Sequence, residues 1–211
     1  MLSTESSHGF FFDAVTSSFN LILNLDTSLF RVVITSLQVS IFSVLIASLI
    51  AIPLGIIIAL NKFPGRKILL IILNTLMALP TVVIGLLLYG ILNRRGLLGE
   101  LGLLYTPTAI TIGLCVLILP VICNLTVSAV HNTDKRLSDK CKLLGVTQIQ
   151  EVFIYISEAR FMIMTAVVTG FGRAIGEVGI AMMVGGNIEG FTRTMTTAIA
   201  LETSKGSFEF A

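Results

Sequence analysis

Two ionisable side chains, Arg173 and Glu177, stand four residues apart in an otherwise apolar stretch of the chain. On a helix this spacing places both on one face. A charged residue inside a membrane span is costly and marks a candidate functional site. Either Arg173 faces a pathway and attracts an anion, or the two side chains form an internal ion pair that fixes helix packing. The ion pair is favoured, because Glu177 would neutralise the field that an anion needs.

A second group of candidate residues follows the same stretch. Backbone amides and hydroxyl groups hold tetrahedral dianions in proteins, and glycine, asparagine and threonine supply such groups here. An ordinary turn at the exit of a span is the alternative, and it is the favoured one. The residues of this group are Gly185, Gly186, Asn187, Thr192 and Thr194.

Catalysis within the membrane is not indicated. An intramembrane protease needs paired Ser and His, paired Asp, or a metal cluster within its spans. The chain has only two histidines, His8 and His131, and Glu177 is the only acid well inside a predicted span. The three cysteines are too scattered for a metal or redox motif. We therefore expect a non-catalytic protein with no metal or cofactor site of its own.

The composition is that of an integral membrane protein. Of 211 residues, 55% are hydrophobic and 12% are charged, whereas soluble domains carry about 25% charged residues. The few basic residues are scattered between apolar runs, which argues against nucleic-acid binding. A span needs about 20 apolar residues. The predicted spans are Val32–Leu60, Ile68–Leu92, Thr108–Val130 and Phe161–Val184, with a fifth, incomplete span beginning near Thr194.

The segment before the first span differs from the others. Phe10–Leu25 is shorter than a span and contains Asp13, so we expect residues 1–27 to form an interfacial helix. Residues 28–211 then form one transmembrane domain, all-α in class. Prolines inside three of the spans predict helix kinks.

Lys and Arg residues in the loops indicate the orientation, because cytoplasmic loops carry an excess of both. The loop after the first span and the polar segment 132–160 lie on one side, and they hold eight such residues against three on the other. The segment 132–160 is therefore predicted to be cytoplasmic. The eight are Lys62, Arg66, Lys67, Lys135, Arg136, Lys140, Lys142 and Arg160, and the three are Arg94, Arg95 and Arg193.

The polar segment 132–160 lies between apolar runs and must lie outside the lipid. Its pattern predicts a helix over Asp134–Leu144, capped by Asp134 or Ser138, then a turn at Gly145, then a helix over Thr147–Ile156. Glycine suits such a turn because positive φ costs it nothing. Two short helices around a glycine form a compact knob for a partner to grip, although an ordinary solvated loop is an equal alternative on these residues alone.

This segment resembles the cytoplasmic coupling loop of ATP-binding-cassette importer permeases. That loop opens with Glu-Ala-Ala, has a glycine six residues after the glutamate, and later a Leu-Pro pair. Here Asp139 replaces the glutamate and Lys140-Cys141 replaces the alanine pair, while Leu144-Gly145-Val146 keeps the glycine spacing. The Leu-Pro pair is absent, and Glu158-Ala159-Arg160 falls in that region.

The stretch after the loop resembles oxyanion permeases, and tungstate-type permeases most of all, with molybdate permeases as close relatives. The similarity is carried by residues 170–188, which read GFGRAIGEVGIAMMVGGNI, and by residues 192–206, which read TRTMTTAIALETSKG. It extends over about Leu29 to Ala211.

This resemblance implies a homodimeric importer permease of the type I kind in the membrane of a bacterium or archaeon. Two ATPase subunits, which use ATP and Mg²⁺, would dock on the cytoplasmic loops, and an extracytoplasmic binding protein would deliver the anion. The permease itself would hydrolyse nothing. The residues implied for the ATPase contact are Asp139, Cys141, Leu144, Gly145, Val146, Glu158 and Arg160.

Two alternatives remain open at this point. Molybdate or another small anion is the alternative substrate, since the binding protein sets the high-affinity choice. A passive channel or membrane scaffold is the alternative from a different class. A channel has no need of the knob, so co-purification of an ATPase separates it from a permease.

Overall fold

The computed structural model describes residues 27–61, 63–133 and 136–206, and every regular element among them is helical. The chain is all-α, as predicted. The predicted interfacial helix over residues 1–27 lies outside the described residues, apart from Thr27. The elements are α2 (Thr27–Leu60), α3 (Arg66–Ala78), α4 (Thr81–Leu92), η1 (Gly99–Leu101), α5 (Pro107–His131), α6 (Arg136–Leu143), α7 (Gln148–Glu158), α8 (Arg160–Ile175), α9 (Gly179–Gly185) and α10 (Met195–Lys205).

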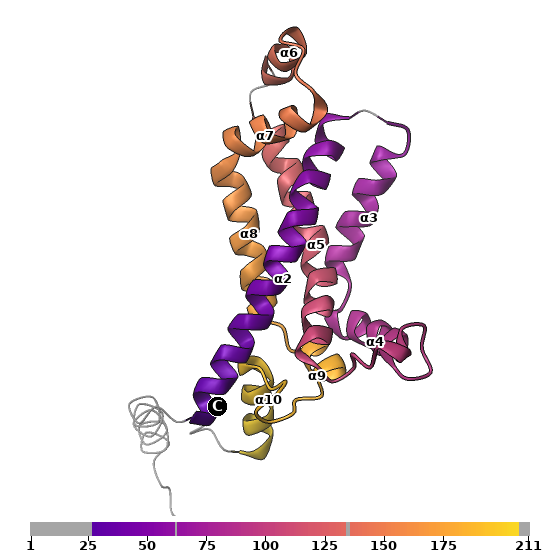
Figure 1. The fold of residues 1–211 in the computed structure, drawn as a ribbon, viewed down its shortest axis with the longest axis vertical. Helices are drawn as coiled ribbons and strands as arrows, with labels where there is room; N and C mark the ends of the chain where they lie inside the picture. Colours follow the sequence, from indigo (N-terminus) through magenta and orange to yellow (C-terminus); the bar gives the residue numbers. More distant parts are fainter. Residues whose placement is uncertain (1–26, 62, 134–135, 207–211) are drawn as a thin grey trace, which may run out of the picture.

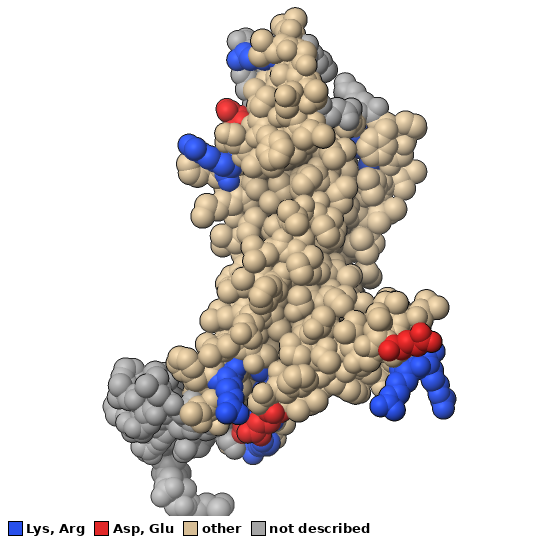
Figure 2. Space-filling view, in the orientation of Figure 1, with Lys and Arg blue, Asp and Glu red and all other residues tan. Residues whose placement is uncertain are grey.

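The longer helices run along the long axis of the molecule, and the shorter ones gather at its two ends (Figure 1). Helices α2, α3, α5 and α8 form the bundle, α6 and α7 cap one end, and α4, α9 and α10 lie at the other. Charged side chains on the visible face lie near the two ends and leave the middle free of charge (Figure 2). This is the distribution expected of a protein whose middle section lies in lipid.

Helices α2 and α5 are each long and apolar enough to cross a membrane, and they form the centre of the bundle. Small side chains let them approach closely. A Cβ atom added at Gly55 of α2 would lie 2.8 Å from the carbonyl oxygen of Cys123. The Ser43 hydroxyl donates to the Thr111 carbonyl at 3.0 Å. Gly55 therefore sets the distance between the two central helices.

The second predicted span, Ile68–Leu92, is broken. Helix α3 ends at Ala78, α4 begins at Thr81, and the two axes differ by 98°. The cause is Pro80, which has no amide hydrogen and disfavours helical backbone in the residue before it. Leu79 accordingly has extended angles, φ −64° and ψ 135°. The sequence predicted one span with a proline kink, and in the structure Pro80 separates two helices at a sharp angle.

The fourth predicted span, Phe161–Val184, is also divided. Helix α8 begins after an 83° bend from α7 and ends at Ile175, and α9 starts only at Gly179. The fifth helix begins where predicted, since Thr194 caps α10 with the side chain accepting from the Thr197 amide. With each bent pair taken as one crossing, α2, α3–α4, α5 and α7–α8 give up to four spans, and α10, with 11 residues, is not among them.

Candidate functional site

The knob predicted within 132–160 is present at one end of the bundle (Figure 1). Helix α6 ends at Leu143, and Gly145 has φ +66°, the left-handed conformation predicted for it. The Val146 amide donates to the Cys141 carbonyl at 3.1 Å and closes the turn. Ser138 lies inside α6, so the predicted capping by Ser138 is wrong, and Asp134 is outside the described residues.

A capping box that we had not predicted starts the second helix of the knob. Thr147 accepts from the Gln150 amide, and the Gln150 side chain accepts from the Thr147 amide at 2.9 Å. Thr-x-x-Gln is the sequence pattern of this motif, so the signal was present in the sequence. The capping box fixes where α7 leaves the turn at Gly145.

Part of the knob surface is apolar and strongly exposed. Four side chains on α6, α7 and the turn between them are between 66% and 87% exposed at the end of the molecule, beyond the bundle. A patch of this kind on a polar protein surface marks an interaction site. We call it the apolar knob surface, and its residues are Leu143, Leu144, Ile149 and Phe153.

The opposite side of the knob is anchored to the bundle. Tyr155 is 4% exposed and packs with Ile56 of α2 and Val130 of α5. Cys141 is also 4% exposed. Its side chain is therefore packed in the protein interior, and its place among the predicted coupling-loop residues stays a prediction.

The other predicted coupling residues are placed as follows. Leu144 and Gly145 are exposed and Val146 is half-buried, so this turn lies at the surface. Glu158 and Arg160 are exposed at the corner between α7 and α8, where the Arg160 guanidinium lies 4.9 Å from the Phe161 ring centroid. The side chain of Asp139 lies outside the described part of the structure.

Arg66 joins three helices directly below the knob. Its Nε donates to the Ile58 carbonyl at 2.8 Å and its Nη2 to the Ala59 carbonyl at 3.2 Å, which satisfies the end of α2. The same Nη2 lies 2.7 Å from Nε2 of His131, the last residue of α5. Arginine has only donors, so Nε2 of His131 is the acceptor and its ring is neutral. Arg66 thus holds the ends of α2 and α5 together just before the knob begins.

Arg173 and Glu177 do not form the ion pair that we favoured. The two ion pairs among the described residues are Arg193–Glu189 and Lys205–Glu202. A four-residue spacing brings two side chains together only when both lie in the same helix, and α8 ends at Ile175, before Glu177. Instead, Glu177 Oε1 accepts from the Ile180 amide at 3.1 Å, and Arg173 Nη2 donates to the Met77 carbonyl at 3.4 Å.

Glu177 belongs to a buried polar junction between α8, α10 and α2. Its side chain is 8% exposed, and its backbone carbonyl accepts from the Thr196 hydroxyl at 2.8 Å. The Met195 amide donates to the Ser36 hydroxyl at 2.6 Å. Buried polar groups need such partners, and these bonds tie the start of α10 to the break between α8 and α9.

The predicted oxyanion group around residues 185–194 bonds several of its polar atoms within its own turn, whereas Asn187 Nδ2 donates to the Thr197 carbonyl of α10 at 3.5 Å and Asn187 Oδ1 is buried without a partner. Gly186 and Asn187 have φ of +70° and +50°. The fully buried Thr192 hydroxyl donates to the Gly185 carbonyl at 2.6 Å and accepts from the Ile188 amide at 3.0 Å. Thr194 caps α10. These contacts are those of a structural turn, and a role of the group in transport stays a prediction.

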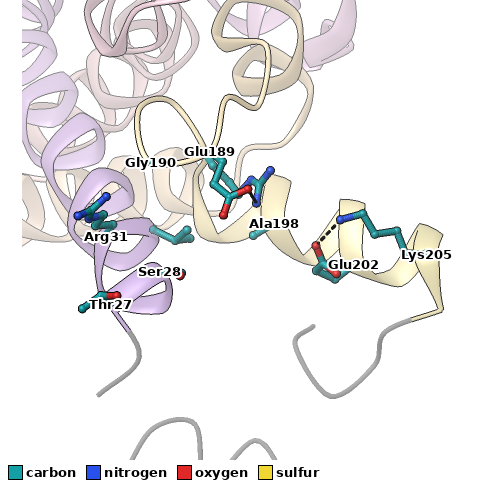
Figure 3. A pocket seen from close by; sticks show the side chains of 10 residues that line it. Thr27, Ser28, Arg31, Glu189, Gly190, Ala198, Glu202 and Lys205 are labelled. Carbon is teal, nitrogen blue, oxygen red and sulfur yellow. Dashed lines mark hydrogen bonds and ion pairs between the residues drawn. The ribbon is translucent and has the colours of Figure 1, made fainter. Parts of the chain in front are cut away.

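A charged pocket that sequence reasoning missed lies at the end opposite the knob, between the start of α2 and α10 (Figure 3). Glu189 pairs with Arg193 at 3.4 Å and Glu202 with Lys205 at 2.9 Å. Arg31 of α2 adds a third cation to the lining. The pocket brings together residues more than 150 positions apart, so no local pattern in the sequence could reveal it.

Residues 51–205 match the family described as "Binding-protein-dependent transport system inner membrane component". The chain belongs to this family, and it is a permease of the ATP-binding-cassette importer class.

Particular relatives are similar over most of the chain. It is 36% identical over 195 residues to the tungstate uptake system permease protein TupB of Peptoclostridium acidaminophilum, covering 92% of this chain and 86% of the relative. It is 38% identical to TupB of Campylobacter jejuni, over 94% and 83% of the two chains. A probable anion ABC transporter permease protein of Haloferax volcanii is 37% identical, over 89% and 82%.

Proposed function

We propose that this chain is the membrane permease of an ATP-driven tungstate importer. The observation that carries the proposal is its similarity, along nearly its whole length, to two permeases named for tungstate uptake. The breaks between α3 and α4 and between α8 and α9 are compatible with this function, since non-helical backbone at membrane depth occurs where it lines a cavity or is buried in protein. Molybdate is the second candidate substrate, because it is also a tetrahedral dianion.

The apolar knob surface is the proposed docking surface for the partner ATPase. Its exposed side chains lie beyond the membrane section, while Tyr155 packs the knob against α2 and α5. A movement of the ATPase would therefore be transmitted to the bundle through a knob that is fixed at its root. The ATPase would use ATP and Mg²⁺, and this chain would contribute no catalytic residue.

In this proposal the protein is a multi-pass component of the cell membrane and acts as a homodimer. The knob end faces the cytoplasm and contacts two ATPase subunits. The opposite end, with its charged pocket, faces an extracytoplasmic binding protein. The anion passes between the two copies.

Reconstitution tests the substrate. The chain is assembled with its cognate ATPase and binding protein and placed in proteoliposomes that contain ATP. We expect tungstate to accumulate inside, as measured by elemental mass spectrometry, and molybdate to compete more weakly. Uptake that is equal without ATP would contradict the importer and favour a passive channel.

Substitution of the apolar knob surface tests the docking. We expect Leu144→Ser with Phe153→Ser to lower the amount of co-purified ATPase by about tenfold or more, since a few side chains that become buried in an interface carry most of its binding energy. Leu97→Ser is the matched control, because Leu97 is 92% exposed at the opposite end. Equal recovery of the ATPase with both proteins would place the docking surface elsewhere.

A further inference from the structure

Three polar side chains from three helices meet around Met77, near the end of α3. Asn124 of α5 donates from Nδ2 to Asn74 Oδ1 of α3 at 2.6 Å, and it contacts the Met77 sulfur at 3.4 Å. Arg173 of α8 donates to the Met77 carbonyl at 3.4 Å. We call Asn74, Met77, Asn124 and Arg173 the Met77 cluster.

The Met77 cluster lies at the depth of the hydrocarbon. Helices α3, α5 and α8 all start or finish at the knob end, at Arg66, His131 and Arg160. At about 1.5 Å per residue, Asn124 lies about 10 Å, Asn74 about 12 Å and Arg173 about 20 Å from those ends. A bilayer has a hydrocarbon core of about 30 Å, so the cluster lies within it.

The cluster is open on the surface of the single chain. Asn74 is exposed, and Asn124 and Arg173 are half-buried. Amide and guanidinium groups are too costly to face lipid, so at this depth they face water or protein. The surface of α2 is different, since its exposed side chains, such as Leu45 and Leu49, are apolar. The Met77 cluster thus marks a face of the bundle that is turned away from lipid.

The groups left unbonded in the cluster are mainly donors. Asn74 Nδ2 makes no hydrogen bond among the described contacts, and Arg173 Nε is buried without a partner. If the amide oxygen and nitrogen of both asparagines are exchanged, one amide NH₂ group is still left without a hydrogen bond. The nearest intramembrane carboxylate in sequence, Glu177, is bonded to the Ile180 amide. One guanidinium and one amide NH₂ with no paired acid suit a ligand that presents several acceptor oxygens and negative charge.

We propose that the Met77 cluster lines the route of the anion, and that Asn74, Asn124 and Arg173 bind the oxygens of a tetrahedral oxyanion in transit. The inference rests on the proposed function and adds the residues that contact the substrate. A neutral amide pair beside a single arginine holds a dianion weakly enough for it to leave, which transport requires.

Isosteric charge substitution tests the contact. In the reconstituted complex we expect Asn74→Asp to lower anion uptake by about tenfold or more, because the new carboxylate repels the anion at close range in a region of low dielectric constant. Assembly with the ATPase and its basal ATP hydrolysis are expected to stay within twofold of wild type, roughly, since the knob is unchanged. The matched control is Thr75→Val, because Thr75 is the next residue of α3 and its hydroxyl is bonded to the Ile71 carbonyl at 2.9 Å. Wild-type uptake by an assembled Asn74→Asp complex would overturn the proposal.

A second measurement does not depend on transport. Asn74→Cys, Asn124→Cys and the lipid-side control Leu45→Cys are made on a chain without native cysteines. Each is treated with an anionic methanethiosulfonate reagent. We expect the two cluster positions to react at least about ten times faster than position 45, since thiolates react only where water and the reagent reach them. Equal rates at all three positions would overturn the proposed route. If the cluster positions react faster but the wild-type complex carries no tungstate, the proposed substrate is contradicted and the proposed route is not.

Discussion

At the scale of single residues, the point where α8 ends decides which partners Arg173 and Glu177 have. Arg173 and Glu177 are four positions apart, which suggests an ion pair, but α8 ends between them. Glu177 then acts on the next helix by accepting from the Ile180 amide. Arg173 reaches the carbonyl of Met77, where α3 approaches its break at Pro80.

This arrangement predicts that Glu177→Gln is tolerated. Glutamine keeps an acceptor for the Ile180 amide, so the melting temperature in detergent should be nearly unchanged. Glu177→Leu removes the acceptor and should cost about 1–2 kcal/mol, as the loss of a capping bond does. If the charge of Glu177 were paired with Arg173, Glu177→Gln would instead cost about 3–5 kcal/mol. A loss of that size would contradict this arrangement and support an ion pair between Arg173 and Glu177.

Gly145 provides the second prediction at this scale. Its φ of +66° strains most side chains by roughly 1–3 kcal/mol, whereas asparagine adopts this conformation more readily. We expect Gly145→Val to uncouple ATP hydrolysis from uptake, while Gly145→Asn retains both. No atom lies within 4 Å of a Cβ added there, so the difference would arise from the backbone and not from a clash. Full coupling in Gly145→Val would show that the shape of this turn is not needed.

At the scale of the elements, glycine contact and proline breaks determine how the helices lie. The contact at Gly55 brings α2 against α5, and Pro80 turns α4 by 98° from α3. Both features position the Met77 cluster, because α5 and α3 carry its asparagines. Gly55 and Pro80 are therefore both positions that shape the bundle.

Gly55 gives the prediction for this scale. Gly55→Ala places a methyl group 2.8 Å from the Cys123 carbonyl and the Thr126 Cβ. Overpacking of this kind costs about 1–3 kcal/mol, and we expect a lower melting temperature in detergent. Gly90→Ala in α4 is the matched control, since no atom lies within 4 Å of its added Cβ, and it should be neutral or stabilising. An equal response of the two variants would show that α2 and α5 have room to separate.

At the scale of the whole molecule, the chain has two polar ends that serve different partners in the proposed function. At the knob end, Tyr155 packs the knob against α2 and α5. The opposite end carries α4, the 185–194 turn and the charged pocket. The Met77 cluster lies between them.

Orientation is the prediction for the whole molecule. On a chain without native cysteines, Leu144→Cys and Leu97→Cys place thiols at the two ends, at side chains 80% and 92% exposed. An impermeant thiol reagent should label intact cells at position 97 and reach position 144 only after permeabilisation, following the excess of Lys and Arg at the knob end. The reverse pattern would place the knob outside the cell.

The sequence by itself determined the all-α membrane class, the polar knob with its left-handed glycine, and the family. These features depend on local composition and on motifs, which a linear chain displays directly. It did not determine which polar residues meet. The pairs Asn74–Asn124, Arg173–Met77 and Arg66–His131 join positions 50, 96 and 65 residues apart. Only the packing of α3 and α8 against α5, with breaks at Pro80 and Ile175, decides those contacts, because each depends on where a helix ends as well as on which residues it contains.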